Sequence, residues 1–188
     1  DLEKLEILRL TGNELTGEIP DNIMNLNNLK ILKLNSNQLR GNIPEDIGSL
    51  SNIDSLYLSY NNFSGEIPPS ITEIESLTFL SLNNNNFSGS IPEDIGSLDH
   101  LKYLYLNNNQ LSGEIPQSIG NLVNLKRLYL LNNNLSGEIP DSICNVYSIN
   151  EYFRLYLHNN KLCQGLVGYP ECLPDSHVGY QNTTECGD

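Results

Sequence analysis

The sequence predicts an α/β solenoid, in which short parallel strands stack side by side along one wall of a coiled chain. Six asparagines recur every 24 residues, namely Asn13, Asn37, Asn61, Asn85, Asn109 and Asn133. Around each asparagine the same pattern of leucine, glycine, isoleucine and proline returns, as segments 29–50 and 101–122 show. A fixed period of this length is typical of repeat proteins, whose coils share one continuous core.

Each repeat is expected to begin with a short strand. In residues 104–107, L-Y-L-N, alternate side chains point to opposite faces of the strand, so the leucines face the interior and the residues between them face outward. Neighbouring strands lie ~4.8 Å apart, so seven coils predict a parallel sheet roughly 30 Å long.

The turn after the strand is expected to depend on the repeated asparagine. The chain bends inward there and buries backbone groups that need hydrogen-bond partners, and an amide offers both a donor and an acceptor. The glycine that follows permits a tight backbone path. The next proline cannot donate to a ladder and limits a second strand, and later apolar residues such as Ile119 and Leu122 close the core from the opposite side.

A seventh copy of the pattern is expected at Tyr152, Leu155, Leu157, Asn160 and Leu162. Asn160 follows Asn133 by 27 residues instead of 24, which places three extra residues near 149–151.

The frame L-x-x-L-x-L-x-x-N-x-L-x-G-x-I-P-x-x-I-x-x-L resembles the plant-type leucine-rich repeat of 24 residues. Its G-x-I-P segments lie at 17–20, 41–44, 65–68, 89–92, 113–116 and 137–140. The resemblance implies a right-handed superhelix with the parallel sheet on its concave face and short 3-10 or irregular segments on its convex face. It predicts about seven repeats over residues 1–163, without the cysteine-bearing N-terminal cap that family members usually have, and a disulfide-bonded C-terminal cap over 164–188.

Four cysteines, Cys144, Cys163, Cys172 and Cys186, indicate two disulfides and an oxidising, extracellular compartment. The resemblance favours pairing Cys163 with Cys172, which leaves Cys144 with Cys186. Repeat phase favours another pairing: Cys144 follows Asn133 by 11 residues and Cys172 follows Asn160 by 12, so these two cysteines would stack on adjacent coils.

Composition excludes several classes of function. The formal net charge of −13 disfavours nucleic acid as a partner, and no apolar run approaches a membrane span. His100, His158 and His177 are scattered and no catalytic, cofactor or metal motif is present, so we expect no enzyme, cofactor or metal. Sequons at Asn62, Asn86, Asn134 and Asn182 permit N-glycosylation in a secreted glycoprotein.

Charge is expected to separate between the two faces. The strand segments hold seven of the ten basic residues, Arg9, Lys30, Lys33, Lys102, Lys126, Arg127 and Arg154, but only two acids, Glu6 and Asp54. Ten other acids gather around the glycine and proline positions, on the edge and back of the solenoid. A basic inner wall would steer a ligand of opposite sign to it, although basic residues also keep an exposed sheet soluble.

Aromatic side chains are expected on the same wall. One outward column contains Tyr57, Tyr105, Tyr129 and Tyr156, and the column before it contains Phe79 and Tyr103. Tyrosine suits recognition because it offers a rigid ring and a hydroxyl, but it also has a high strand propensity. The candidate ligand-binding residues are Arg9, Lys33, Tyr57, Phe79, Tyr103, Tyr105, Arg127, Tyr129, Arg154, Tyr156 and His158.

The predicted function is extracellular recognition of a protein, peptide or anionic glycan on the concave wall. The resemblance supports it, since similar plant-type solenoids are receptor ectodomains and inhibitors of pectin-degrading enzymes. The first alternative is a structural or adhesive protein that self-associates through its uncapped N-terminal end. The second is ice binding by the outward polar column Thr11, Asn35, Ser59, Asn83 and Asn107.

Overall fold

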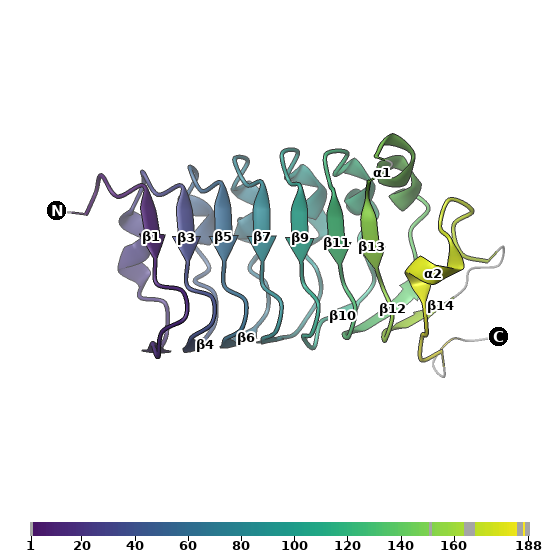
Figure 1. Cartoon of the computed structure of the whole chain (residues 1–188), viewed down its shortest axis with the longest axis horizontal. Coiled ribbons are helices and arrows are strands. Elements are labelled where there is room, and N and C mark those ends of the chain that lie inside the picture. Colours follow the sequence, from purple (N-terminus) through teal and green to yellow (C-terminus); the bar gives the residue numbers. More distant parts are fainter. Residues whose placement is uncertain (1, 151, 164–167, 184–185, 187–188) are drawn as a thin grey trace.

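The computed structural model describes residues 2–150, 152–163, 168–183 and 186, and it shows a stack of coils (Figure 1). One strand from each coil joins a seven-stranded parallel sheet in the order β1-β3-β5-β7-β9-β11-β13, as the sequence predicts. The strands are β1 Ile7–Arg9, β3 Ile31–Lys33, β5 Ser55–Tyr57, β7 Phe79–Ser81, β9 Tyr103–Tyr105, β11 Arg127–Tyr129 and β13 Arg154–Tyr156.

The register of this sheet keeps equivalent residues of successive coils side by side. Leu8 pairs with Leu32 and Leu32 with Leu56, and the same offset continues to β11. Leu128 then pairs with Leu155, so the longer seventh repeat joins the sheet without a slip. The outward residues therefore form straight columns across the sheet, because every strand alternates its faces in phase with its neighbours.

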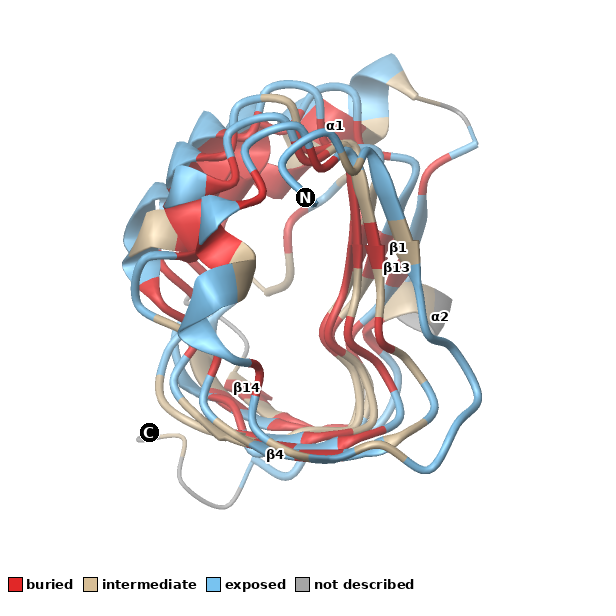
Figure 2. Ribbon diagram, turned by 90° about the vertical axis from the view of Figure 1, so that its left-hand side faces the viewer, coloured by how far each residue is buried: buried red, intermediate tan, exposed pale blue. Residues whose placement is uncertain are grey.

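Figure 2, a view along the stack, shows the other two sides of the coil. Short second strands line one flank in two sheets, and each ends before the proline of its repeat. They are β2 Thr16–Gly17, β4 Gln38–Gly41, β6 Asn62–Gly65 and β8 Asn86–Phe87, then β10 Ser112–Gly113, β12 Asn134–Glu138 and β14 Lys161–Cys163. The convex side carries the 3-10 helices η1 Asp21–Asn25, η2 Ile47–Ser49, η3 Pro69–Glu73, η4 Glu93–Ser97 and η5 Gln117–Asn121, followed by α1 Ile143–Ile149.

The core is one continuous apolar column inside the coils. Leucines of the sheet, such as Leu56 and Leu80, meet isoleucines of the convex side, such as Ile71 and Ile95, and all four are at most 1% exposed. Phe63 and Phe87 stack within this core at a centroid distance of 6.1 Å. Within the described residues, no helix combines the length and apolar character that a membrane crossing requires.

The repeated asparagines form a buried ladder that connects each coil to the one before it. Asn85 Nδ2 donates to Leu82 O in its own coil and to Leu58 O in the preceding coil, at 3.0 and 3.1 Å. Its Oδ1 accepts from Phe63 N of the preceding coil at 3.1 Å. Asn37, Asn61, Asn109, Asn133 and Asn160 repeat this arrangement. The predicted role of the asparagines is therefore confirmed.

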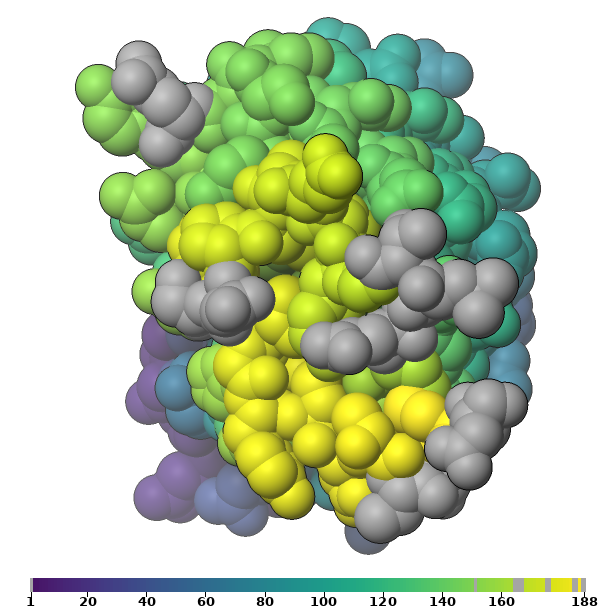
Figure 3. All heavy atoms as spheres, turned by 90° about the vertical axis from the view of Figure 1, so that its right-hand side faces the viewer, coloured from purple at the N-terminus to yellow at the C-terminus, as the bar shows by residue number. Residues whose placement is uncertain are grey.

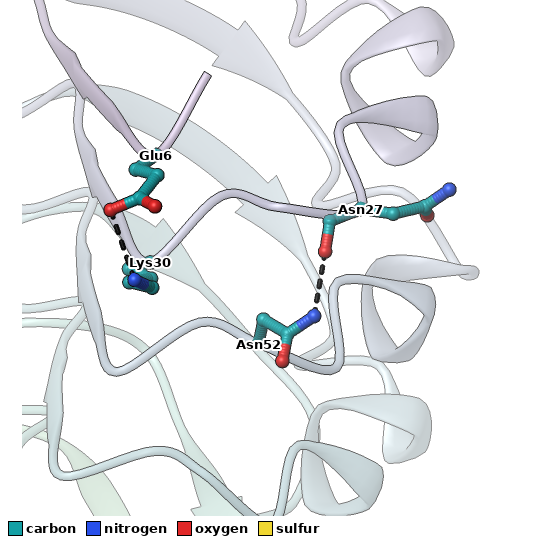
Figure 4. A network of polar contacts seen from close by, with 4 residues as sticks. All are labelled: Glu6, Asn27, Lys30 and Asn52. Carbon is teal, nitrogen blue, oxygen red and sulfur yellow. Dashed lines mark hydrogen bonds and ion pairs between the residues drawn. The ribbon is translucent and has the colours of Figure 1, made fainter. Parts of the chain in front are cut away.

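Two further sets of side-chain hydrogen bonds also connect neighbouring coils. On the edge where the strands begin, Asn52 Nδ2 donates to Asn27 O at 2.7 Å, beside the Lys30–Glu6 ion pair (Figure 4). His100 occupies the equivalent position two coils later, with Nδ1 3.2 Å from Glu75 O, so it has a structural role. At the inner turn, asparagine amides link directly to one another, from Asn159 through Asn132 and Asn108 to Asn84.

The seventh repeat differs from its predicted alignment. Tyr152 does not fill the first core position: it is 72% exposed, and Phe153 is buried instead at 2%. The convex segment here is the seven-residue helix α1, and Tyr147 of that helix packs against Phe153 with ring centroids 6.3 Å apart. The extra residues near 149–151 follow the helix, although Glu151 lies outside the described residues.

The disulfide pairing that the resemblance favoured is wrong. Cys144 bonds to Cys172, and Cys163 bonds to Cys186. Repeat phase gave the correct partner for Cys144, because the two cysteines occupy nearly the same position in successive coils. One disulfide therefore joins α1 to the C-terminal segment, and the other joins β14 to it. Residues 164–167, at the start of the expected C-terminal cap, lie outside the described residues.

The C-terminal segment covers the last coil and continues its hydrogen bonding (Figure 3). After α2, Asp175–Val178, Asn159 N donates to Tyr180 O at 2.7 Å. Gln181 then takes the place of a ladder asparagine: its Nε2 donates to Leu157 O and Val178 O at 3.0 and 2.7 Å. The repeat pattern did not predict this role, because glutamine replaces asparagine and Gln181 follows Asn160 by 21 residues.

Substitution of Asn85 by alanine is expected to lower the free energy of unfolding by about 2–4 kcal/mol, because Phe63 N and two carbonyls lose a buried partner. Asn13→Ala is the matched control: Asn13 is exposed and bonds only within its own coil, to Leu10 O and Thr11 O. Urea denaturation followed by circular dichroism measures both. Equal losses in the two variants would contradict a ladder that acts between coils.

Stability is expected to fall in mild acid because of His177 in α2. Burial, with a smaller contribution from Arg154, lowers the pKa of this imidazole below its ordinary 6.5, and Nδ1 has no partner in the described part of the chain. The unfolded chain therefore binds the proton more readily than the folded one, and the contribution is present above pH ~6.5 and lost as pH falls through the lower folded pKa. Melting temperatures of wild type and His177→Phe between pH 8 and 5 test this. Parallel pH profiles would refute it.

Candidate ligand-binding wall

The concave wall is formed by the outward residues of the seven-stranded sheet. The two columns predicted from the sequence are adjacent in the structure, since residues two apart on one strand share a face. In β9, for example, Tyr103 and Tyr105 both lie on the wall with Leu104 buried between them.

An unbroken row of aromatic rings crosses this wall, and we call it the aromatic row. Successive ring centroids are 4.3 Å apart for Tyr57 and Phe79, 5.5 Å for Phe79 and Tyr105, 4.9 Å for Tyr105 and Tyr129, and 4.8 Å for Tyr129 and Tyr156. Four of the contacts along the row and its branch at Tyr103 are edge-on or tilted, geometries that aromatic pairs favour. The row comprises Tyr57, Phe79, Tyr103, Tyr105, Tyr129 and Tyr156.

Two predicted cations contact the row. Lys33 Nζ lies 4.2 Å from the centroid of the Tyr57 ring, and the Arg127 guanidinium carbon lies 5.9 Å from that of Tyr103. Arg127 Nη1 also donates to the Tyr105 hydroxyl at 3.4 Å. The wall therefore presents positive charge held against aromatic faces, a combination in which ring and cation attract each other.

The ionisation of these groups is fixed near neutral pH. Burial raises the pKa of the Tyr57 and Tyr129 hydroxyls above their ordinary 10.0. The hydrogen bond to Tyr105 raises the pKa of the Arg127 guanidinium above its ordinary 12.5. Near neutral pH, Tyr57 and Tyr129 are accordingly neutral hydrogen-bonding groups, and Arg127 carries a full positive charge.

Both acids of the strand segments are engaged in the N-terminal half of the sheet. Glu6 pairs with Lys30 at 2.9 Å, the one ion pair between described residues, and Asp54 accepts from Ser55 and Thr78 hydroxyls at 2.6 and 2.9 Å. The C-terminal half carries Lys102, Lys126, Arg127 and Arg154, all exposed. Positive charge on the wall is thus least compensated around β9, β11 and β13.

The remaining candidate residues make fewer contacts with the aromatic row. Arg9 lies beside Lys33 in the sheet but makes no ring contact, and Arg154 Nη1 turns back to Phe153 O at 3.2 Å. His158 lies at the C-terminal end of the wall, 6.3 Å from the Tyr156 ring. A Cβ at Gly179 would come within 2.7 Å of His158 Cβ, so the C-terminal segment packs closely behind it.

A hollow of about 440 Å³ opens beside the aromatic row, and the repeat pattern did not predict it. Its signal was present as serines, Ser59 and Ser81, in outward columns where other coils carry larger residues. The lining residues are Ser59, Tyr60, Phe79, Ser81, Asn83, Tyr105, Asn107, Arg127 and Tyr129.

Other predicted features lie elsewhere or are interrupted. The sequon asparagines Asn62, Asn86 and Asn134 are exposed on the flank of second strands, and Asn182 is exposed in the C-terminal segment, with Thr184 outside the described residues. The polar column considered for ice binding is interrupted at Ser59, which is only 6% exposed. Within the described residues, no group of histidine, cysteine or carboxylate side chains has the geometry of a metal site.

Family models match much of the repeat region. Residues 3–63 match a model described as leucine rich repeat, and residues 75–117 and 99–144 match one described as leucine rich repeats in two copies. The comparison with curated proteins found no match.

Solved structures with the same fold include plant receptors and a bacterial protein. The Arabidopsis receptor kinase HAESA, in complex with the peptide hormone IDA and the co-receptor SERK1, is 40% identical with a TM-score of 0.82, covering 87% of this chain and 27% of HAESA. The plant peptide hormone receptor RGFR1 in complex with RGF2 is 33% identical with a TM-score of 0.76. The match covers 88% of this chain and 30% of RGFR1. A leucine-rich repeat protein of Leptospira interrogans is 35% identical with a TM-score of 0.73. The match covers 87% of this chain and 39% of the Leptospira protein. The chain therefore spans less than a third of each receptor chain.

Proposed function

The chain belongs to the plant-type leucine-rich repeat family, and from this membership we propose that it is an extracellular recognition module whose concave wall binds a peptide segment of negative or mixed charge. The observation that carries the proposal is the aromatic row with cations held against it in the centre of the wall.

Aromatic residues and arginine dominate the energetics of recognition surfaces, because they combine large rigid contact area with hydrogen bonding. Here successive ring centroids lie 4.3–5.5 Å apart, so each ring is held in place by its neighbours. Little side-chain entropy is therefore lost when a ligand binds to the rings. The uncompensated cations around β11 favour a ligand that carries carboxylates.

The structural relatives support a peptide as the ligand class. HAESA and RGFR1 are both receptors solved with peptide hormones, and this chain shares their fold at 33–40% identity. An anionic glycan is the second candidate, favoured by the same pairing of rings with cations, since aromatic faces and positive charge suit an acidic sugar as well as a peptide.

An extracellular location agrees with the two disulfides, which persist in oxidising compartments. The exposed sequon asparagines lie on the flank and in the C-terminal segment, so glycans attached there would leave the concave wall open.

Self-association through the N-terminal end is the alternative function. Leu2 is 65% exposed there, and light scattering over a range of concentrations tests it. A monomer at every concentration would count against an adhesive role. Ice binding is tested by thermal hysteresis, and we expect none because Ser59 interrupts the polar column.

Replacement of Tyr105, Arg127 and Tyr129 by alanine is expected to weaken ligand binding by more than about 100-fold, because these residues form the centre of the wall. The measurement is binding to an array of acidic and neutral peptides and anionic glycans, at low and at physiological salt. We expect salt-sensitive binding of acidic peptides by the wild type, since added salt screens exposed charges.

A control variant removes one arginine and one exposed tyrosine outside the aromatic row. Arg40 lies on the flank, and Tyr152, just before β13, is 72% exposed. The double alanine variant of these residues should bind as the wild type does. Unchanged affinity in the wall variant, or a blank array with the wild type, would contradict the proposed function.

A further inference from the structure

The hollow beside the aromatic row has an identifiable origin in two small residues. Ser81 stands in the outward column between Tyr57 and Tyr105, where a tyrosine would be the fifth of that column. Phe79 of the neighbouring column instead leans across to stack on Tyr57 at 4.3 Å. Ser59 is the second small residue, in a column that otherwise holds threonine, asparagine, leucine and histidine. The space these side chains leave open becomes the hollow.

The lining of the hollow is polar at the base and aromatic at the sides. Ser59 and Ser81 are 6% and 4% exposed, and the Ser81 hydroxyl donates to Asn83 Oδ1 at 2.8 Å. This bond occupies Oδ1 of Asn83 as an acceptor, and Nδ2 of the same amide remains a hydrogen-bond donor. Phe79, Tyr105 and Tyr129 supply the aromatic sides.

Arg127 is the charged residue among those that line the hollow. No carboxylate of the described residues pairs with it. Its Nη1 donates to the Tyr105 hydroxyl, and a phenol that accepts one hydrogen bond keeps its own proton to donate to another group. The hollow thus combines a cation, a phenol, the Ser59 hydroxyl and amide donors, without an acid among its lining residues.

We propose that this hollow is a subsite for the carboxylate of an aspartate or glutamate side chain in the bound peptide. The inference rests on the proposed function, in that it assigns this carboxylate to a peptide on the wall. Charge-assisted hydrogen bonds from arginine are the strong ones for a carboxylate, and the hydroxyl and amide donors complete its coordination. Neither serine nor asparagine would repel the anion, whereas other hollows of this chain contain acids such as Glu18, Glu45 and Asp99.

The test uses a small probe that does not depend on knowing the natural ligand. N-acetyl-glutamate N-methylamide is titrated into the ¹⁵N-labelled chain at low salt, and amide shifts of Ser59, Ser81, Asn83 and Asn107 are followed. We expect saturable shifts confined to the hollow, with a roughly millimolar Kd. The glutamine analogue, of the same shape but uncharged, should bind at least about fivefold more weakly.

Three variants sharpen the result. Arg127→Gln should remove the preference for glutamate over glutamine, while Arg40→Gln on the flank should preserve it. Ser59→Leu should fill the hollow and abolish the shifts; leucine already occurs in that column as Leu131. An unchanged melting temperature identifies a folded variant, and Arg127→Gln gives an independent result if Ser59→Leu does not fold.

Equal binding of the two analogues, or shifts outside the hollow, would overturn the proposal. Binding of galacturonic acid without binding of the glutamate probe would also overturn it, and would assign the hollow to an anionic sugar. If the wall binds peptides on the array but the analogues bind equally, only this inference fails. If the array is blank while the glutamate probe binds, the carboxylate site stands and the proposed function fails.

Discussion

The buried asparagine ladder is the interaction on which the rest of the structure depends. Each coil turns inward after its strand, and the backbone there would lose hydrogen bonds to water without gaining others. One side-chain amide meets this need in two coils at once, as Asn85 does for Leu82, Leu58 and Phe63. Because the amide bridges coils, it also sets their register, and the register places the outward residues in columns. The aromatic row exists only because those columns are straight.

The sequence predicted the repeated elements well, because each repeated residue meets a requirement of the backbone or the core that recurs every coil. Strand leucines, ladder asparagines and the prolines that end the second strands all belong to this group. Predictions failed where the period changed. Phe153 replaces Tyr152 in the core because α1 is longer than the 3-10 helices, and Gln181 enters the ladder at a spacing that the repeats do not contain.

The wall was predictable in composition but not in shape. The columns gave the identities of its rings and cations, yet they could not show that Phe79 leans onto Tyr57 and leaves an open hollow beside Ser81. That outcome depends on side-chain packing between two columns, whereas periodicity describes each column alone. The disulfides show the same difference between sources of prediction. The positions of the cysteines within the repeats predicted Cys172 as the partner of Cys144, whereas the family resemblance predicted Cys186.

The coil-to-coil hydrogen bonds have a consequence for how such a protein can evolve. Every ladder bond lies within one coil or joins it to its immediate neighbour, and the five ladder asparagines from Asn37 to Asn133 share one 24-residue spacing. Duplication or deletion of one whole repeat in the gene would therefore re-form the same bonds across the new junction. The aromatic row would lengthen or shorten by the rings that the repeat carries, two in the coil of β9, while the C-terminal segment with Gln181 would continue to end the stack. Recombination could thus move or multiply ligand contacts without a new folding problem to solve.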